Sequence, residues 1–306
     1  MRLLICVPIL LAGCGAGGEH VLLRTVGTIE NPELDEVSGL AQSRRYEELL
    51  WVVNDDGPAS LHAVSQRGEN LGQVTVAGAT NEDWEDLAAF AYQDKNYLVV
   101  ADIGDNDARR PSVTLYVVEE PEPAQTEVAL AWRVDFRYPE GPRDAESLAV
   151  DADGELFYIL SKRDVPARLF TVPIRPAGNA TVLASQVAVL DSLPQPSQRQ
   201  RNDAEKSGFS WQPTAMDFAA NAQNALVLTY GGVYFFARDA GQSWHDALRS
   251  TALEFKLGQL SNAEAITLSQ DSMAAHLTVE KQHAPLLRID LAEAHMWHKN
   301  HNMGLR

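Results

Sequence analysis

The stretch Asn81-Glu82-Asp83-Trp84-Glu85-Asp86-Leu87-Ala88 ends in a short pattern that returns along the chain and decides the fold. Four other segments resemble Glu85-Asp86-Leu87-Ala88: Ser38-Gly39-Leu40-Ala41, Glu146-Ser147-Leu148-Ala149, Met216-Asp217-Phe218-Ala219 and Glu264-Ala265-Ile266-Thr267. The shared apolar residues are Leu40, Leu87, Leu148, Phe218 and Ile266, which lie 47, 61, 70 and 48 residues apart. A period near 50 residues is typical of propellers and related repeat folds.

Each segment is followed by two apolar runs and, in the first four units, by a more polar alternating run. The runs are short, rich in Val, Leu, Tyr and Phe, and separated by turn pairs such as Asp153-Gly154 and Gly231-Gly232. Helical patterns do not alternate with them, so the chain is predicted to be an all-β protein, a β-propeller. We expect five blades, with six possible if a long interval hides a degenerate unit. The run Val21 to Ile29 would complete the last blade and close the ring.

The first residues have the features of an export signal, because a basic Arg2 precedes an apolar stretch that is too short to span a membrane. Leu11-Ala12-Gly13-Cys14 resembles the lipobox of bacterial lipoproteins, which implies cleavage before Cys14 and lipidation of that cysteine. An ordinary secretory signal is the alternative. The expected organisation is a signal peptide over 1–13, a lipidated tether over 14–20, a propeller over 21–290 and a tail over 291–306.

The composition excludes several classes of function. With 25 Lys and Arg against 42 Asp and Glu, the formal net charge is −17, which disfavours binding to nucleic acids. Cys6 and Cys14 are the only cysteines, so the mature chain has no disulfide and no thiolate cluster for zinc. The sequence Gly13 to Gly18 fits a dinucleotide-binding pattern, but it follows a signal segment rather than a strand and is rejected.

The repeat places acidic residues from different blades at one end of the ring. Glu85, Glu146 and Glu264 stand two positions before their apolar markers, and Ser38 and Met216 occupy that position in the other units. Because the innermost strands of a propeller line its channel, these side chains are expected to converge at one mouth. Several carboxylates together need a cation or protons, and calcium fits best because it takes many oxygen ligands. The alternative is that the acidic residues only stabilise turns.

The segments Asn81 to Leu87, Asp102-Ile103-Gly104-Asp105-Asn106 and Asp144-Ala145-Glu146-Ser147-Leu148 resemble those of bacterial phytase-like or esterase-like propeller proteins. Propeller phytases hold calcium in an acidic mouth beside basic residues, and related lactonases use a central divalent cation. The resemblance implies that Glu85, Asp102, Glu146 and Glu264 bind a metal. It also implies that Lys162, Arg163 and Lys281 contact an anion. The chain departs from this pattern at Met216, which offers no carboxylate.

Three further features are weaker. The insertion from Ser192 to Trp211 carries Arg199, Arg201 and Lys206 and is expected either to cover the mouth or to be a surface loop. His295, His298 and His301 in the tail could share a helix face, although an ordinary tail is favoured. Trp84 and Tyr230 are expected to pack in the core or channel rather than to stack on a ligand.

Two functions remain open at this stage. One is a lipid-anchored propeller of the bacterial cell envelope that holds calcium or another divalent cation and binds a small molecule or an envelope protein. The other is a metal-dependent hydrolase of a phosphoester, ester or lactone. The resemblance to lipoproteins of diderm bacteria implies sorting to the outer membrane, facing the periplasm, because Gly15 rather than Asp follows the cysteine. No catalytic motif decides between them, and a Ser-His-Asp arrangement stays open because geometry, not order, defines it.

Overall fold

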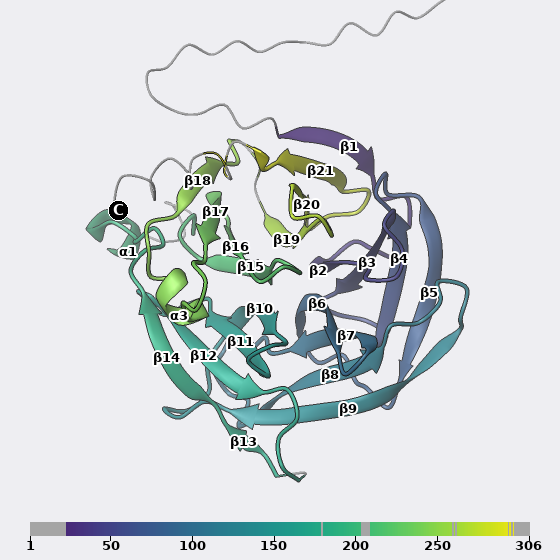
Figure 1. Ribbon diagram of the computed structural model, residues 1–306, viewed down its shortest axis with the longest axis horizontal. Coiled ribbons are helices and arrows are strands. Elements are labelled where there is room, and N and C mark those ends of the chain that lie inside the picture. The colour runs from purple at the N-terminus through teal and green to yellow at the C-terminus, as the bar shows by residue number, and fades with distance from the viewer. Residues whose placement is uncertain are drawn as a thin grey trace, which may run out of the picture.

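The repeated segments form five inner strands that surround a central axis (Figure 1). The computed structural model describes residues 23–178, 180–202, 209–258, 260, 262–292, 294 and 296. The inner strands are β2 (Val37–Gln42), β6 (Trp84–Tyr92), β10 (Ala145–Asp151), β15 (Pro213–Phe218) and β19 (Ala263–Leu268). Each contacts the next, and β19 contacts β2, so the ring of strands is closed.

Each inner strand is followed by two strands that pair antiparallel, one after the other, toward the outside of the ring. The second strands are β3 (Leu49–Asn54), β7 (Lys95–Asp102), β11 (Leu156–Ser161), β16 (Asn224–Thr229) and β20 (Ala274–Val279). The third strands are β4 (Ser60–Ser65), β8 (Val113–Glu119), β12 (Ala167–Pro173), β17 (Gly232–Ala237) and β21 (Pro285–Asp290). The expected all-β propeller fold is therefore confirmed.

A fourth strand completes each unit at the rim. These strands are β5 (Asn70–Ala77), β9 (Glu127–Arg137), β14 (Ser185–Leu190), β18 (Leu253–Lys256) and, in the last unit, β1 (Arg24–Thr28). β1 pairs antiparallel with β21, with Arg24 opposite Arg288 and Thr28 opposite Pro285. The N-terminal run thus takes the place that the sequence indicated for it, and the edge of β21 is covered.

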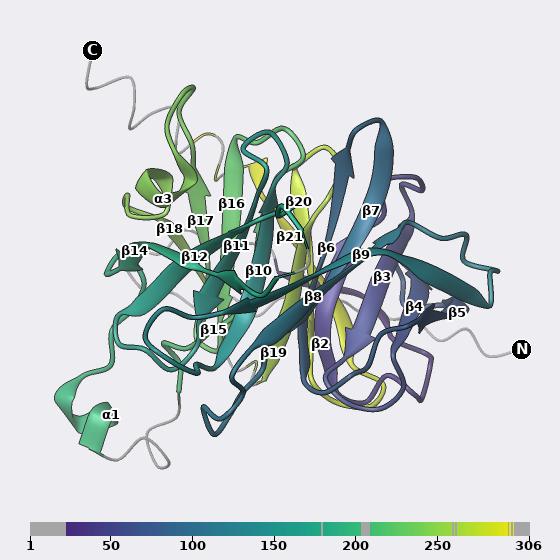
Figure 2. The ribbon, with the colours of Figure 1, turned by 90° about the horizontal axis from the view of Figure 1, so that it is seen from below.

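The remaining elements lie at the rim and at the two ends of the ring. β5 pairs parallel with β9, and the short β13 (Val182–Leu183) also pairs parallel with β9. The helices α1 (Gln198–Asn202) and α3 (Trp244–Ala247) project from opposite ends (Figure 2). The inner strands begin at the end that carries α1. We call this end the mouth and the other the far end.

Burial explains why the strands differ in sequence. The second strands are covered on both faces by neighbouring blades, and Leu49 to Val53 in β3 are all buried. The outer strand β9 has one face in solvent, so its buried and exposed residues largely alternate. Apolar clusters fill the spaces between blades; one joins the first and second units around Trp51 and Trp84, which are both 0% exposed. Trp84 is a core residue, as expected.

Every inner strand carries a β-bulge near its start. The positions of these bulges correct the alignment of the fourth repeat that the sequence alone suggested. The residue left out of the pairing is Ser38, Glu85, Glu146, Thr214 or Glu264 in the five strands. The equivalent of Glu85 in the fourth unit is therefore Thr214 and not Met216. The apolar residue matching Leu87 there is Met216, and Phe218 was the wrong marker because hydrophobicity alone cannot reveal a two-residue shift along a strand.

Candidate functional site

Three side-chain positions of each blade gather at the mouth. The bulge residue is the first. The second lies two residues before it and accepts, through its carbonyl, a hydrogen bond from a backbone N–H that follows the second strand. This bond recurs in all five units, from Asp55 to Glu36, Gly104 to Asp83, Lys162 to Asp144, Tyr230 to Gln212 and Glu280 to Asn262. The five donor residues are the third position.

The bulge residues divide into two chemical types. A bulge turns the side chain of the extra residue away from its normal position in the strand. The hydroxyls of Ser38 and Thr214 donate to the backbone carbonyls of Trp84 and Ala263 in the next blade, at 2.7 and 2.8 Å. Glutamates fill the three other positions: Glu85, Glu146 and Glu264. The predicted convergence of carboxylates therefore involves three blades, with hydroxyls in the other two.

Glu85, Asp144 and Glu146 form the closest acidic group. They each offer a carboxylate oxygen, and these oxygens lie within 4.8 Å of one another. All three residues are at least nine-tenths buried. Asp144 is held by the N–H of Asp105 at 3.0 Å and by Arg163 Nε at 2.6 Å. Oε2 of Glu146 is buried and has no hydrogen-bond partner among the described residues. This oxygen is an acceptor within the group that no described donor satisfies.

Lys162 supplies a positive charge to this group. Its ammonium forms an ion pair with Oε1 of Glu146 and lies 5.4 Å from the ring centre of Tyr230. Tyr230 in turn donates to Glu264 at 2.6 Å. Lys162 is 8% exposed, so this lysine is part of the interior of the mouth rather than a free surface cation.

Gly104 allows two carboxylates to approach each other. A Cβ atom built at this position would lie 2.3 Å from Cγ of Asp83 and 2.4 Å from Oε1 of Glu85. The segment Asp102 to Asn106 therefore helps to form the acidic group in two ways. Gly104 leaves room for the carboxyl groups because it has no side chain, and Asp105 donates its backbone N–H to Asp144.

Burial favours the neutral forms of these acids. It is the largest cause that raises the pKa of Glu85 well above its ordinary value, with the charge of Asp83 next, while Lys162 opposes it. Burial likewise raises the pKa of Asp83 to about 6 and raises that of Glu264, against the effect of Lys162. At the edge of the mouth, a hydrogen bond with Glu280 and partial burial raise the pKa of Glu36 to about 7. The mouth therefore favours proton binding by its carboxylates more than open solvent does.

The other predicted site residues have different surroundings. Asp102 and Glu264 lie outside the close acidic group, whose third member is Asp144. Oδ1 of Asp102 accepts a hydrogen bond from Arg110 at 2.7 Å. The sequence contained a signal for the position of Asp144, because Asp144 stands two residues before Glu146 and residues two apart in a strand point to the same face. Lys281 is exposed. Cys14, Lys206 and the tail histidines lie outside the described residues.

A pocket of about 450 Å³ opens beside the acidic group. Its lining includes Lys162, Arg163, Tyr230 and Asn262 of the mouth, with Phe209 from the insertion before β15. Arg163 keeps a partly exposed side chain although it is bonded to Asp144. Two of the three predicted anion contacts thus line one pocket that also has apolar walls.

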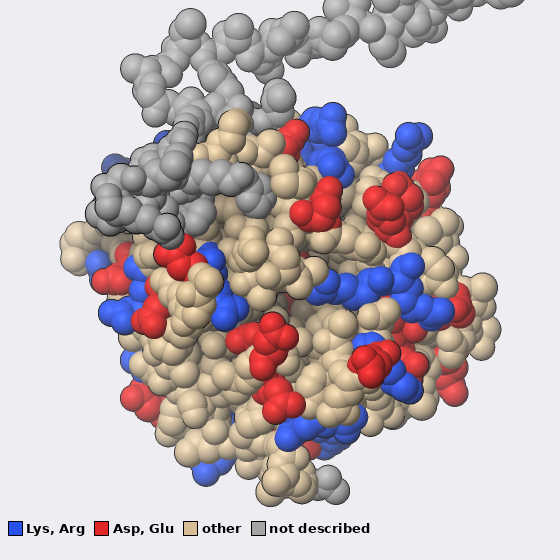
Figure 3. All heavy atoms as spheres, in the orientation of Figure 1, with Lys and Arg blue, Asp and Glu red and all other residues tan. Residues whose placement is uncertain are grey.

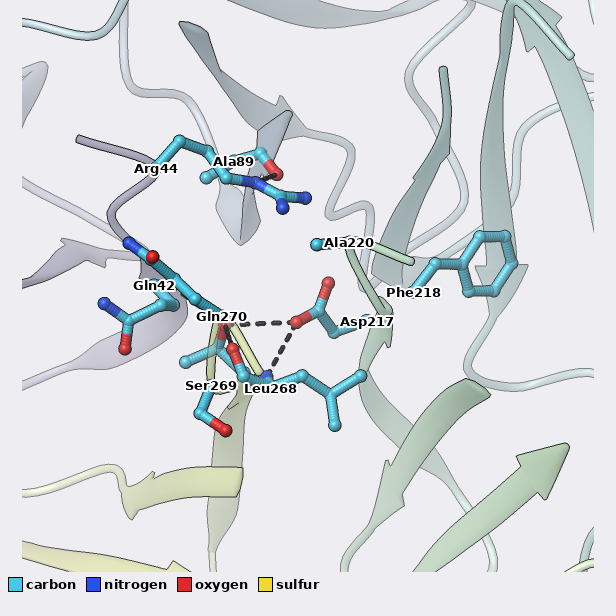
Figure 4. Close-up of a pocket in the computed structure, with 10 residues that line it drawn as sticks. Gln42, Arg44, Ala89, Asp217, Phe218, Ala220, Leu268, Ser269 and Gln270 are labelled. Atoms are coloured by element: carbon cyan, nitrogen blue, oxygen red, sulfur yellow. Dashed lines mark hydrogen bonds between the residues drawn. The ribbon is translucent and has the colours of Figure 1, made fainter. Parts of the chain in front are cut away.

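The far end of the ring is a separate, narrow site. Figure 3 shows this end, which is hollowed at the axis and carries both acidic and basic side chains. A cavity of about 20 Å³ lies there, large enough for one water molecule. Arg44 and Asp217 face it from different blades (Figure 4). Asp217 accepts hydrogen bonds from the N–H of Leu268 at 2.8 Å and from the hydroxyl of Thr267 at 3.1 Å.

Comparisons with known proteins give no family. No family model matches the chain, and no curated protein matches it. Solved structures that resemble it include the PQQ-bound aldose sugar dehydrogenase from Streptomyces coelicolor, with a TM-score of 0.46 and 13% identity over 90% of this chain and 99% of that one. Another is U3-55K, with a TM-score of 0.40 and 13% identity over 83% of this chain and 68% of that one. Among the described residues, no helix is long and apolar enough to cross a membrane.

Proposed function

We propose that this chain is a bacterial envelope lipoprotein whose five-bladed propeller binds a small molecule or an envelope protein at a mouth that holds calcium or another divalent cation. The observation that carries the proposal is the group of three buried carboxylates, Glu85, Asp144 and Glu146, with a partnerless oxygen on Glu146. A buried carboxylate oxygen without a partner is costly, and a hard cation with oxygen ligands would satisfy it.

The strand pairing supports five blades. Five groups of four strands surround the axis, and β1 and β21 join the two ends of the chain in the last group. The five bulges and the five equivalent backbone hydrogen bonds at the mouth support the same count.

The envelope location rests on the sequence from Leu11 to Cys14. The direction of β1 bears on how such an anchor would orient the propeller. β1 runs antiparallel to β21 and begins at the far end of the ring. An anchor upstream of Arg24 would thus join the propeller on the side opposite the mouth, which leaves the mouth accessible to ligands.

The pocket beside the acidic group supports ligand binding. It has the size of a small-molecule site and combines the apolar Phe209 and Leu260 with the basic Arg163. Such a lining suits a ligand that has an apolar part and an anionic group. The bound cation would order the carboxylates beneath this ligand.

Hydrolysis of a phosphoester, ester or lactone is the second candidate. One observation favours it: burial and the neighbouring charge of Asp83 raise the pKa of Glu85 well above its ordinary value, and a carboxyl group with a raised pKa is suited to act as a general acid. A bound divalent cation would supply Lewis-acid polarisation of the substrate. Catalysis requires an open coordination position, and ligand binding does not.

Calorimetric titration of the full chain in detergent with calcium chloride tests the cation site. We expect saturable binding to the wild type and loss of most of it in Glu146→Gln. Glu119→Gln is the matched control, because Glu119 is exposed at the end of β8 and forms an ion pair with the exposed Lys95. Absence of binding to the wild type would refute the cation site.

Assays with generic phosphoester and ester substrates then separate the two functions. Turnover that requires a divalent cation and disappears with chelator and in Glu146→Gln would establish the hydrolase. No turnover with any divalent cation, together with calcium binding, would establish the binding protein.

A further inference from the structure

We propose that the ammonium of Lys162 is a built-in cation of the mouth and that a divalent cation binds there in competition with it. This inference rests on the proposed cation site and names the residue that limits its affinity. Lys162 forms an ion pair with Glu146, the residue whose second oxygen is free. The ammonium and the divalent cation would therefore share one carboxylate.

The charge of Lys162 reaches all three bulge glutamates. It pairs directly with Glu146 and favours the charged forms of both Glu85 and Glu264. Three acidic side chains from three blades thus depend on one lysine. A cation bound by Glu85, Asp144 and Glu146 would interact with two of the same side chains, Glu85 and Glu146.

The fold delivers this lysine to the mouth by the hydrogen bond that every blade repeats. The N–H of Lys162 donates to the carbonyl of Asp144 at 3.1 Å, which fixes the backbone beside the acidic group. The equivalent residues in the other blades are Asp55, Gly104, Tyr230 and Glu280. Lys162 is the one basic residue at this position, so the positive charge is a feature of this blade and not of the repeat.

Two like charges cannot share Glu146 at low cost. A divalent cation bound by Glu85, Asp144 and Glu146 would lie a few ångströms from the ammonium, and their repulsion is strong where water is largely excluded. Lysine has a flexible stem, and Lys162 also lines the pocket of about 450 Å³. The pocket therefore gives the side chain room to move when the cation enters.

Calcium titrations of the full chain in detergent compare the wild type with Lys162→Gln. Gln keeps a donor for Glu146 and removes the charge. We expect the variant to bind calcium on the order of tenfold more tightly, or more, because the repulsion is gone. Lys256→Gln is the control, since it removes the same charge from an exposed residue of the outer strand β18, outside the mouth. Its affinity should match that of the wild type.

A second variant, Lys162→Arg, keeps the charge and should bind calcium no more tightly than the wild type. Thermal unfolding with and without calcium provides a second readout, because tighter binding gives a larger rise in Tm. If Lys162→Gln folds only when calcium is present, that dependence supports the competition, because the cation then replaces the missing charge of Lys162.

The outcomes separate the two proposals. Equal or weaker calcium binding by Lys162→Gln, with binding retained in the wild type, overturns the competition and leaves the cation site. Binding by Lys162→Gln alone supports the competition and overturns cation binding by the wild type. No binding by either protein overturns both.

Discussion

The carboxylate of Asp86 accepts a hydrogen bond at 2.7 Å from the backbone N–H of Leu148 in the next blade. The same oxygen accepts from Met216 N–H, one blade further, at 3.2 Å, and the other oxygen accepts from Leu87 N–H at 2.8 Å. Asp86 is 1% exposed. One side chain therefore links the inner strands β6, β10 and β15 directly beside the acidic residues of the mouth.

Replacing Asp86 should destabilise the ring. Asp86→Ala leaves three buried N–H groups without partners, and we expect the free energy of unfolding to fall by about 3 kcal/mol. Asp86→Asn keeps one acceptor oxygen and should cost roughly half as much. Urea denaturation measures both, with the exposed Asp153→Ala as the control that changes little. An Asp86→Ala protein as stable as the control would show that these hydrogen bonds contribute nothing net.

Gly104 provides a test of the close approach between Asp83 and Glu85. Gly104→Ala would place its Cβ within 2.4 Å of both side chains, so the carboxyl groups must move apart. We expect calcium affinity to drop about tenfold, which corresponds to a loss of about 1.4 kcal/mol. The readout is calorimetric titration.

Gly178→Ala is the matched control for Gly104→Ala. Gly178 has a φ of +78°, and no atom of the described part of the chain lies within 4 Å of an added Cβ, so its variant carries backbone strain without a collision there. Its stability should decrease by about 1 kcal/mol while its calcium affinity stays unchanged. If both variants lose affinity alike, the effect is general destabilisation and not displacement of the carboxylates.

Hydrophobic patterning predicted the strands and the mouth because both depend on features that a sequence displays directly. Leu87, Leu148 and Ile266 mark buried positions of inner strands, and a strand alternates its faces regularly. Residues at the same distance from these markers therefore face the same way. This reasoning correctly placed Glu85 and Glu146 in one group.

The bulges and the ion pairs could not be predicted in the same way. A bulge changes the pairing without changing the apolar pattern, so Met216 and Phe218 were equally acceptable markers. Asp102 ends a second strand and Lys162 follows one, but whether such a side chain binds a metal or a neighbouring charge depends on its partner. Arg110 and Glu146 are those partners, and both are set by three-dimensional contacts.

Asp217 predicts a pH dependence at the far end. Burial raises its pKa from 3.8 to about 6. Between these values the native chain keeps a proton that the unfolded chain has lost, so this residue makes the native state less stable as the pH rises from about 4 to about 6. Asp217→Asn removes this proton exchange but retains an acceptor oxygen for Leu268.

The measurement is Tm against pH for the wild type and Asp217→Asn. We expect the wild type to lose more stability than the variant between pH 4 and 6, by at most about 1.4 kcal/mol per pH unit. The exposed Asp153→Asn should follow the wild type. Parallel curves for the wild type and Asp217→Asn would mean that Asp217 titrates normally.

Two substitutions in β15 test the register of the fourth blade, because they are expected to have opposite effects. Thr214 occupies the bulge position at which three other blades hold buried glutamates, so Thr214→Glu should place a fourth carboxylate at the mouth. It loses the hydrogen bond to Ala263, at a cost of about 1 kcal/mol, and should bind calcium more tightly. Thr214→Val removes only the hydrogen bond and is the control.

Met216→Glu should behave in the opposite way. Met216 is 1% exposed and packs in an apolar cluster with Phe218 and Trp244, so a glutamate there would be a buried charge without a partner. We expect a loss of more than about 4 kcal/mol, enough to prevent stable folding. Circular dichroism and calcium titration of both glutamate variants decide the register. A folded, calcium-binding Met216→Glu beside an unfolded Thr214→Glu would restore Phe218 as the marker, because only that alignment directs residue 216 into the mouth.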